Sequence, residues 1–251
     1  MGIGEAIKKG FGVAKSSMGL VLLLSVFGFI FNMIQQTQAP VDAEAAPSPM
    51  VIVAGVIYIF LAIFFQAGQL GYVRDKIKTG QAALSNFLSS GGKYYLSILV
   101  LGLIVSLIIG VFVLLAALAV AMLQNVQVLS VPLAILCAAL GVYFVIMLFL
   151  SPYAVVIDDK NVKQAIGLSM KLVKRSILKL LGISAILILI GFGIGLLLGA
   201  ILAGIGFVVK QQMASQVVFA VLSSFVNAYL GIAVTATFMH FYLSLPERNN
   251  S

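Results

Sequence analysis

The chain has 251 residues, of which 62% are hydrophobic and only 9% are charged. Its mean hydropathy is +1.19, whereas soluble domains are about 45 to 50% apolar and about 25% charged. This composition excludes a soluble enzyme and is typical of an integral membrane protein.

Six apolar stretches follow one another along the chain, and each is long enough for a hydrocarbon core that needs about 20 helical residues. Backbone groups in lipid must be satisfied internally, and the alternation typical of an outer-membrane barrel is absent, so the stretches are predicted to be helices. Hydropathy, charges and turn residues place them at residues 18–34, 50–68, 94–123, 129–150, 180–209 and 217–243. The sequence therefore predicts an all-α polytopic membrane protein with six transmembrane helices. The third and fifth stretches are long enough to require tilt or interfacial ends.

Basic residues are distributed unevenly between the predicted loops. Every Lys and Arg except Lys210 lies before the first span, between spans two and three, between spans four and five, or after span six. The opposite side has the loop QQTQAPVDAEAAPSP, with Asp42 and Glu44. The positive-inside rule therefore places both termini in the cytoplasm. This topology explains the net charge of +8, and no basic soluble domain is present to bind nucleic acid.

A secretory signal peptide is an alternative interpretation of the first span, because Lys8 and Lys9 precede the apolar run from Met18. That run is long for a signal core, and Pro40 directly follows Ala39, the best cleavage residue. Cleavage would leave five spans with the N-terminus outside and would break the repeat described next. We therefore expect the first span to be retained.

Three segments share one pattern: EAIKKGFGVAKSSMGLVLLL, QAALSNFLSSGGKYYLSILV and QAIGLSMKLVKRSILKLLGI. Each is a short amphipathic segment on the predicted cytoplasmic side that continues into an apolar hairpin. The pattern predicts that the single membrane domain, residues 1–251, is a threefold repeat. The repeats are expected at 1–70, 71–155 and 156–251, each with one cytoplasmic amphipathic helix and one transmembrane hairpin.

The third amphipathic segment carries most of the positive charge. Its apolar residues recur at the helical period and form one stripe, made of Val162, Ile166, Met170, Val173, Ile177 and Leu180. A helix with an apolar and a basic face can lie in the membrane interface with its cations among anionic headgroups. The residues expected to contact headgroups are Lys163, Lys171, Lys174, Arg175 and Lys179. The alternative is that these cations only set the topology and bind no particular lipid.

Groups that could carry chemistry are scarce. No predicted span has an Asp, Glu, Lys or Arg in its interior, which argues against an ion-coupled transporter. The sole histidine, His240, and the sole cysteine, Cys137, supply neither a metal site nor a disulfide within one chain. We interpret Asp158, Asp159 and Asn161 as a turn and helix cap. No catalytic residue, metal site or cofactor is expected.

Small residues recur every four positions in three predicted spans, a spacing that favours close helix packing. The three stripes are Gly102, Ser106 and Gly110; Gly191, Gly195 and Gly199; and Ser223, Asn227, Gly231 and Thr235. We expect the Asn227 amide to bond a neighbouring helix, because lipid would leave it unpaired. The alternative is that the last span lines a polar groove for a lipid headgroup or small solute.

The stretch SPYAVVIDDKNVKQAIGLSMKLVKRSILKLLGI joins a proline-containing span end, two acids and a basic helix that bears Ala-Ile and Ser. It resembles a group of uncharacterised prokaryotic six-helix integral membrane proteins. It is also similar to the membrane domain joined to some bacterial glycerophosphodiester phosphodiesterases. The resemblance is best over residues 150–190, transfers no catalytic residue and implies a lipid-linked or envelope role.

Three functions remain open. The favoured one is a non-enzymatic protein of the inner (cytoplasmic) membrane that organises or binds lipid, or scaffolds a membrane complex, at the cytoplasmic leaflet. Its expected partners are anionic membrane lipids and a membrane protein or second copy of the chain, not nucleic acid. The alternative is a facilitator or channel for a neutral or lipidic substrate, with Gln66, Asn227 and Thr235 along an internal groove. An intramembrane enzyme is the third and is disfavoured by the lack of acids, bases and metal ligands.

Overall fold

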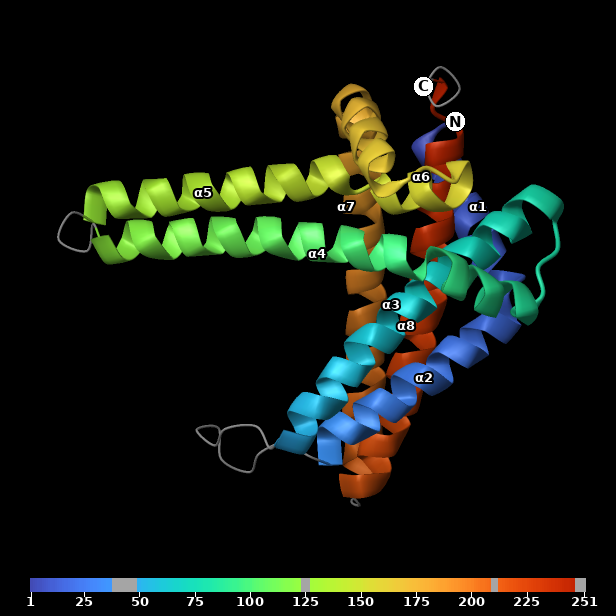
Figure 1. Ribbon diagram of the computed structural model, residues 1–251. Helices are drawn as coiled ribbons and strands as arrows, with labels where there is room; N and C mark the ends of the chain where they lie inside the picture. The colour runs from blue at the N-terminus through green and yellow to red at the C-terminus, as the bar shows by residue number, and fades with distance from the viewer. Residues whose placement is uncertain (38–48, 123–126, 209–211, 247–251) are drawn as a thin grey trace. The chain divides into compact units, whose positions relative to one another are not determined.

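The computed structural model describes residues 1–37, 49–122, 127–208 and 212–246 (Figure 1). These ranges contain eight helices and no strand. The helices are α1 (Ile3–Lys15), α2 (Met18–Thr37), α3 (Pro49–Thr79), α4 (Leu84–Met122), α5 (Gln127–Leu148), α6 (Ser151–Asp158), α7 (Val162–Val208) and α8 (Gln212–Leu243). Asp42 and Glu44 of the predicted acidic loop, Lys210 and Arg248 lie outside the described residues.

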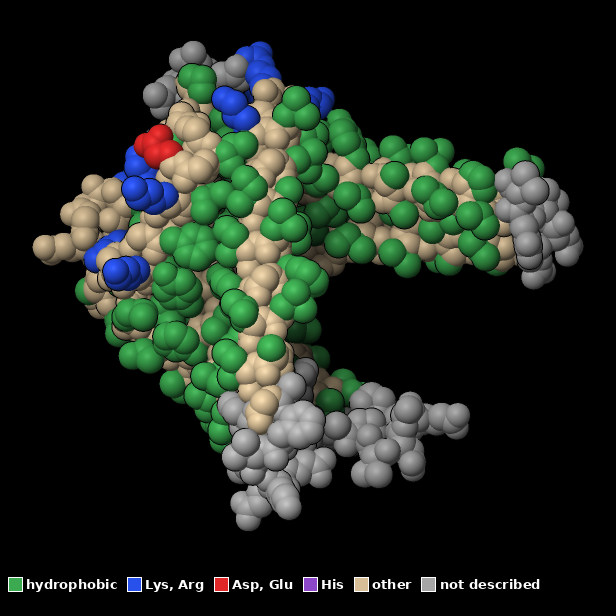
Figure 2. Space-filling view, turned by 180° about the vertical axis from the view of Figure 1, so that it is seen from behind, with side chains coloured by type: hydrophobic (Ala, Val, Ile, Leu, Met, Phe, Trp, Pro, Cys, Tyr) green, Lys and Arg blue, Asp and Glu red, His purple; other side chains and the backbone are tan. Residues whose placement is uncertain are grey.

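The described helices are long and apolar enough for a multi-pass membrane protein. Five stretches qualify as spans, namely Pro49–Thr79, Leu84–Met122, Leu129–Asp158, Val162–Ile201 and Val217–Leu243. A sixth is formed if α1 and α2, which are bent by 78°, count as one span. Large apolar side chains stay uncovered along these helices (Figure 2), for example Leu107 and Ile188, both 69% exposed. Lipid is the solvent that tolerates such surfaces, so the all-α membrane fold predicted from the sequence is confirmed.

Two of the predicted surface segments continue into their spans as single helices. α4 begins at Leu84 and α7 at Val162, ahead of the predicted span starts. In α7 the transition is marked only by a kink at Ser176, where φ is −125° and ψ is 18°. α1 is a separate helix that ends at Lys15 with Ser16 as its C-cap. The Ser16 hydroxyl donates to the Val13 carbonyl at 3.1 Å.

The chain forms two compact units, and each is described by itself. Unit 1 consists of Met1–Lys93 and Leu178–Ser244. Unit 2 consists of Tyr94–Ile177 together with the C-terminal residues from Leu245. The threefold repeat stays a prediction.

In unit 1, α1 packs against α8, at the end that the predicted topology places in the cytoplasm. Its contact face consists of Ala6, Gly10 and Ala14, all buried and spaced four residues apart. A Cβ at Gly10 would lie 2.7 Å from the Ala233 carbonyl oxygen and 2.8 Å from the Thr237 backbone nitrogen. Glycine is therefore what lets the two backbones approach this closely.

A second close approach in unit 1 joins α3 to the first turns of α4. A Cβ at Gly68 would lie 2.7 Å from the Phe87 carbonyl oxygen, and one at Gly71 would overlap the Ser90 side chain. Phe87 is fully buried. These contacts fix the α3 side of the cavity described below.

In unit 2, a serine hydroxyl bridges the break between α5 and α6. The Ser169 hydroxyl donates to the Met147 carbonyl at 2.7 Å and accepts from the Leu150 backbone N–H at 3.1 Å. Ser169 is fully buried. It thus satisfies two backbone groups that the end of α5 leaves without helical partners.

Candidate functional site

A cavity of about 310 Å³ lies between α2, α3 and α8 of unit 1. Its polar lining is uncharged, and the side chains that form it are Asn32, Gln66, Gln69, Ser224 and Asn227. At about 1.5 Å per helical residue, the polar positions from Ser224 to Thr235 extend over roughly 16 Å of α8. We call this cavity the amide groove.

Two of the four amides in the groove cross-link its helices. The Asn32 amide of α2 donates to the Ser224 hydroxyl of α8 at 3.0 Å. The Gln69 amide of α3 donates to the Thr235 hydroxyl of α8 at 2.8 Å. These bonds tie α2 and α3 to the same face of α8 and hold the groove open between them.

The other two amides, those of Gln66 and Asn227, line the groove without a side-chain hydrogen bond to any other described residue. Both residues are exposed. The expected bond from Asn227 to a neighbouring helix is therefore not found within the described ranges; Asn32 makes the cross-helix bond instead. The position of Asn227 fits the alternative expectation of a polar groove.

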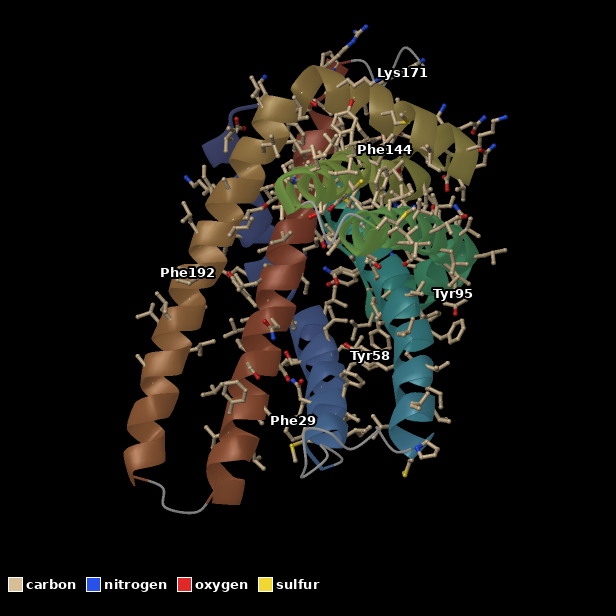
Figure 3. All side chains as sticks on the ribbon, turned by 90° about the vertical axis from the view of Figure 1, so that its left-hand side faces the viewer. Phe29, Tyr58, Tyr95, Phe144, Lys171 and Phe192 are labelled. Atoms are coloured by element: carbon tan, nitrogen blue, oxygen red, sulfur yellow. The ribbon has the colours of Figure 1, made fainter. Side chains whose placement is uncertain are left out.

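Aromatic rings form the wall of the groove between α2 and α3. Phe27 stacks on Phe65 with ring centroids 4.1 Å apart, and on Tyr58 at 5.2 Å. Phe31 also stacks on Tyr58, which projects from α3 toward α2 (Figure 3). On the α8 side, α2 passes near Ser224 at Gly28, where a Cβ would sit 3.6 Å from the Ser224 Cβ, an ordinary contact distance. The groove thus combines an aromatic wall from α2 and α3 with polar side chains from all three helices.

The predicted small-residue stripes have different surroundings. In α8, Thr235 bonds Gln69, Gly231 and Asn227 line the groove, and the Ser223 hydroxyl donates to the Ala220 carbonyl of its own helix. The stripes in α4 and α7 meet no other helix within their own units, because open space surrounds a Cβ built at each of their glycines, and Ser106 is exposed. The members concerned are Gly102, Ser106, Gly110, Gly191, Gly195 and Gly199.

Close approaches occur instead at other glycines, among them Gly10, Gly68 and Gly71, which were not predicted from the sequence. A small-residue spacing was visible in α1, where Ala6, Gly10 and Ala14 lie four positions apart. It was missed because α1 is too short and too charged to be a span. Small-residue spacing marks a face that permits close contact but does not identify the partner.

The basic segment of α7 begins with a helix cap. The Asn161 side chain accepts from the Gln164 backbone N–H at 3.0 Å, and the Gln164 side chain accepts from the Asn161 N–H at 3.3 Å. This reciprocal pair is a capping box. The five cations expected to contact lipid are all exposed, with Lys179 in unit 1 and Lys163, Lys171, Lys174 and Arg175 in unit 2.

The two acids before α7 have structural surroundings. Asp159 caps α6 in the left-handed region, with φ 49°, and its carboxylate accepts from the Tyr94 hydroxyl at 2.6 Å. The described residues include no group of three or more His, Cys, Asp or Glu side chains placed to hold a metal ion. Of the three suggested capping residues, Asn161 is the one that caps α7.

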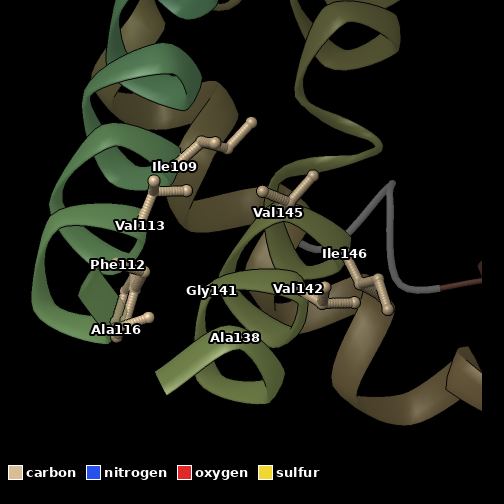
Figure 4. Close-up of a pocket in the computed structure, with 9 residues that line it drawn as sticks. All are labelled: Ile109, Phe112, Val113, Ala116, Ala138, Gly141, Val142, Val145 and Ile146. Carbon is tan, nitrogen blue, oxygen red and sulfur yellow. The ribbon is translucent and has the colours of Figure 1, made fainter. Parts of the chain in front are cut away.

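A second cavity, of about 450 Å³, separates α4 from α5 in unit 2 (Figure 4). Apart from Gly141, every lining residue has an apolar side chain. The two helices are in close contact at Gly141, where a Cβ would lie 2.9 Å from the Phe112 Cβ. Since no polar side chain lines this cavity, it can accept a lipid tail but cannot orient a polar group.

Comparison with known proteins gives one match. A family model matches residues 1–245, which is nearly the whole chain. Searches of curated proteins and of solved structures each found no match. The chain therefore belongs to the family described as a domain of unknown function, DUF7847.

Proposed function

We propose that this protein is a non-enzymatic protein of a prokaryotic inner (cytoplasmic) membrane that binds anionic lipid at the cytoplasmic leaflet through the basic face of α7. That face consists of Lys163, Lys171, Lys174 and Arg175. The proposal rests on one observation. On α7, this basic face lies next to a row of apolar side chains that are only half-buried.

The first turns of α7 present three adjacent faces. Ala165, Leu168 and Leu172 form the inner face and are 0 to 5% exposed. Ile166 and Met170 are half-buried, and at about 100° per residue they lie between the inner face and the cations. An apolar edge next to a basic face is the arrangement by which interfacial helices insert between lipids.

Other partners are part of the same proposal. The uncovered glycine stripe of α7, which contains Gly191, Gly195 and Gly199, would allow another membrane protein or a second copy of the chain to approach closely. Such a contact would let the protein scaffold a complex as well as bind lipid.

Changing Lys171, Lys174 and Arg175 together to Gln should weaken binding of phosphatidylglycerol by roughly 10- to 100-fold. Each cation near an anionic surface contributes about 1 kcal/mol, and three correspond to about 100-fold at most. Native mass spectrometry of the protein with phosphatidylglycerol, and with phosphatidylcholine for comparison, measures the change. The melting temperature should change little, because the three side chains are exposed and exposed ion pairs contribute little to stability.

The matched control removes three exposed lysines elsewhere by changing Lys8, Lys15 and Lys78 to Gln. It lowers the net charge equally but leaves the basic face of α7 intact. If both variants lost phosphatidylglycerol to the same extent, or if neither did, general topology would explain the cations and the proposed lipid contact would be rejected.

Both termini are proposed to be cytoplasmic. Because Cys137 is the only cysteine, Cys137→Ser gives a background in which single cysteines report their side of the membrane. A cysteine at Ser16 should be labelled by an impermeant maleimide only after permeabilisation of cells, and one at Ala43 before it. The reverse labelling pattern would place the basic face of α7 outside and contradict the proposal.

A further inference from the structure

The amide groove is a second candidate for ligand binding, separate from the basic face of α7. It lies within the spans, where hydrocarbon offers no hydrogen bonds to polar groups. Gln66 and Asn227 line it, one from α3 and one from α8, and neither makes a side-chain hydrogen bond to another described residue. Each carboxamide has two N–H donors and an oxygen acceptor. Within the described residues these groups have no protein partner, so a ligand or water would satisfy them.

The lining residues determine which ligand chemistry fits. The lining includes no Asp, Glu, Lys, Arg or His, so an ionic headgroup would enter without a counter-charge. A hydroxyl group both donates and accepts, which matches a carboxamide on each side. The aromatic wall of Phe27, Phe31, Tyr58 and Phe65 suits the apolar part of the same molecule.

The size of the groove limits how much of a ligand it holds. At about 310 Å³ it lies at the lower end of the range for small-molecule sites, about 300 to 1,000 Å³. Such a volume accommodates a small headgroup, while the tails remain in the surrounding lipid.

We propose that the amide groove binds the hydroxyl-bearing, uncharged headgroup of a neutral lipid between Gln66 of α3 and Asn227 of α8. Asn32 and Gln69, through their bonds to Ser224 and Thr235, hold the three helices at the spacing that this site requires. This inference goes beyond the proposed binding of anionic lipid, because it assigns a different site and an uncharged ligand.

The test uses the full-length protein in phosphatidylcholine nanodiscs with dioleoylglycerol as the probe. Native mass spectrometry should show dioleoylglycerol retained more strongly than its acetylated form, which lacks the free hydroxyl. Asn227→Leu and Gln66→Leu should each weaken retention by about tenfold, whereas Ser223→Val, on the same helix but outside the groove lining, should retain dioleoylglycerol as the wild type does. The variant with Lys171, Lys174 and Arg175 changed to Gln should also bind it normally, so the two proposals can fail independently.

Stability measured without added lipid keeps the test decisive. Replacing an unpaired amide by leucine in an apolar environment should leave the melting temperature unchanged or raise it. A lower melting temperature for either leucine variant would show that its amide has a partner in the protein and would overturn the proposal. Equal retention of dioleoylglycerol and its acetylated form would show that the groove does not recognise the free hydroxyl and would overturn the proposal. Equal stabilisation by free glycerol would overturn the assignment to a lipid.

Discussion

Gly10→Val should detach α1 from α8 and lower the free energy of unfolding by about 3 kcal/mol or more. A Cβ at this position would lie within 2.8 Å of two backbone atoms of α8, the Ala233 carbonyl oxygen and the Thr237 nitrogen. Backbone atoms of a packed helix cannot rotate away as a side chain can, so the whole of α1 must move. Thermal unfolding of the purified protein should show a clearly lower melting temperature, and limited proteolysis should cleave α1 first.

Gly12→Val is the matched control on the same helix. Gly12 is exposed, and open space surrounds a Cβ built there. Helix propensity is better for valine than for glycine by a few tenths of a kcal/mol, so this variant should melt at or slightly above the wild-type temperature. If Gly10→Val behaved like Gly12→Val, the packing of α1 on α8 would be refuted.

Ser169→Ala should destabilise unit 2 by about 2 to 4 kcal/mol. The substitution removes the hydroxyl that bonds both the Met147 carbonyl and the Leu150 N–H. Two buried backbone groups then lose their partner, at about 1 to 3 kcal/mol each before relaxation. Chemical unfolding in detergent measures the loss, and hydrogen exchange should report faster exchange at the end of α5.

Ser176→Ala provides the comparison for this second substitution. Ser176 lies on the same helix and is 9% exposed, but its hydroxyl donates only to the Leu172 carbonyl of α7 itself. Its removal should therefore cost about 1 kcal/mol or less. Equal destabilisation by the two substitutions would show that the Ser169 bridge across the α5–α6 break does not contribute to the free energy of unfolding.

Hydropathy predicted the spans because the lipid around a transmembrane helix requires apolar side chains along its whole length. The predicted last span, 217–243, coincides with the stretch Val217–Leu243 of α8. The fourth predicted span, 129–150, likewise ends at the break between α5 and α6. The short helix α6 was not predicted, although Pro152 lies in its first turn, and the hydroxyl of Ser169 that bridges the break is distant in sequence.

Helix partners were less predictable than helix positions. Asn32 bonds Ser224 across 192 positions of sequence, and Gln69 bonds Thr235 across 166. A single sequence shows that these polar residues are unusual in lipid but does not show which ones meet. The same holds for the uncovered glycines of α7. Their spacing would allow another helix to pack closely, but it does not show which helix does so.

The amide groove is lined without carboxyl, imidazole or amino groups among the described residues that form it. Moving one elementary charge across a membrane at 100 mV involves about 2.3 kcal/mol, but a neutral ligand on neutral side chains experiences none of this energy. Occupancy by the neutral lipid proposed above would therefore be uncoupled from the proton gradient and the electrical potential. It would depend on how much of this lipid the surrounding bilayer contains, so the protein would respond to membrane composition and not to the energetic state of the cell.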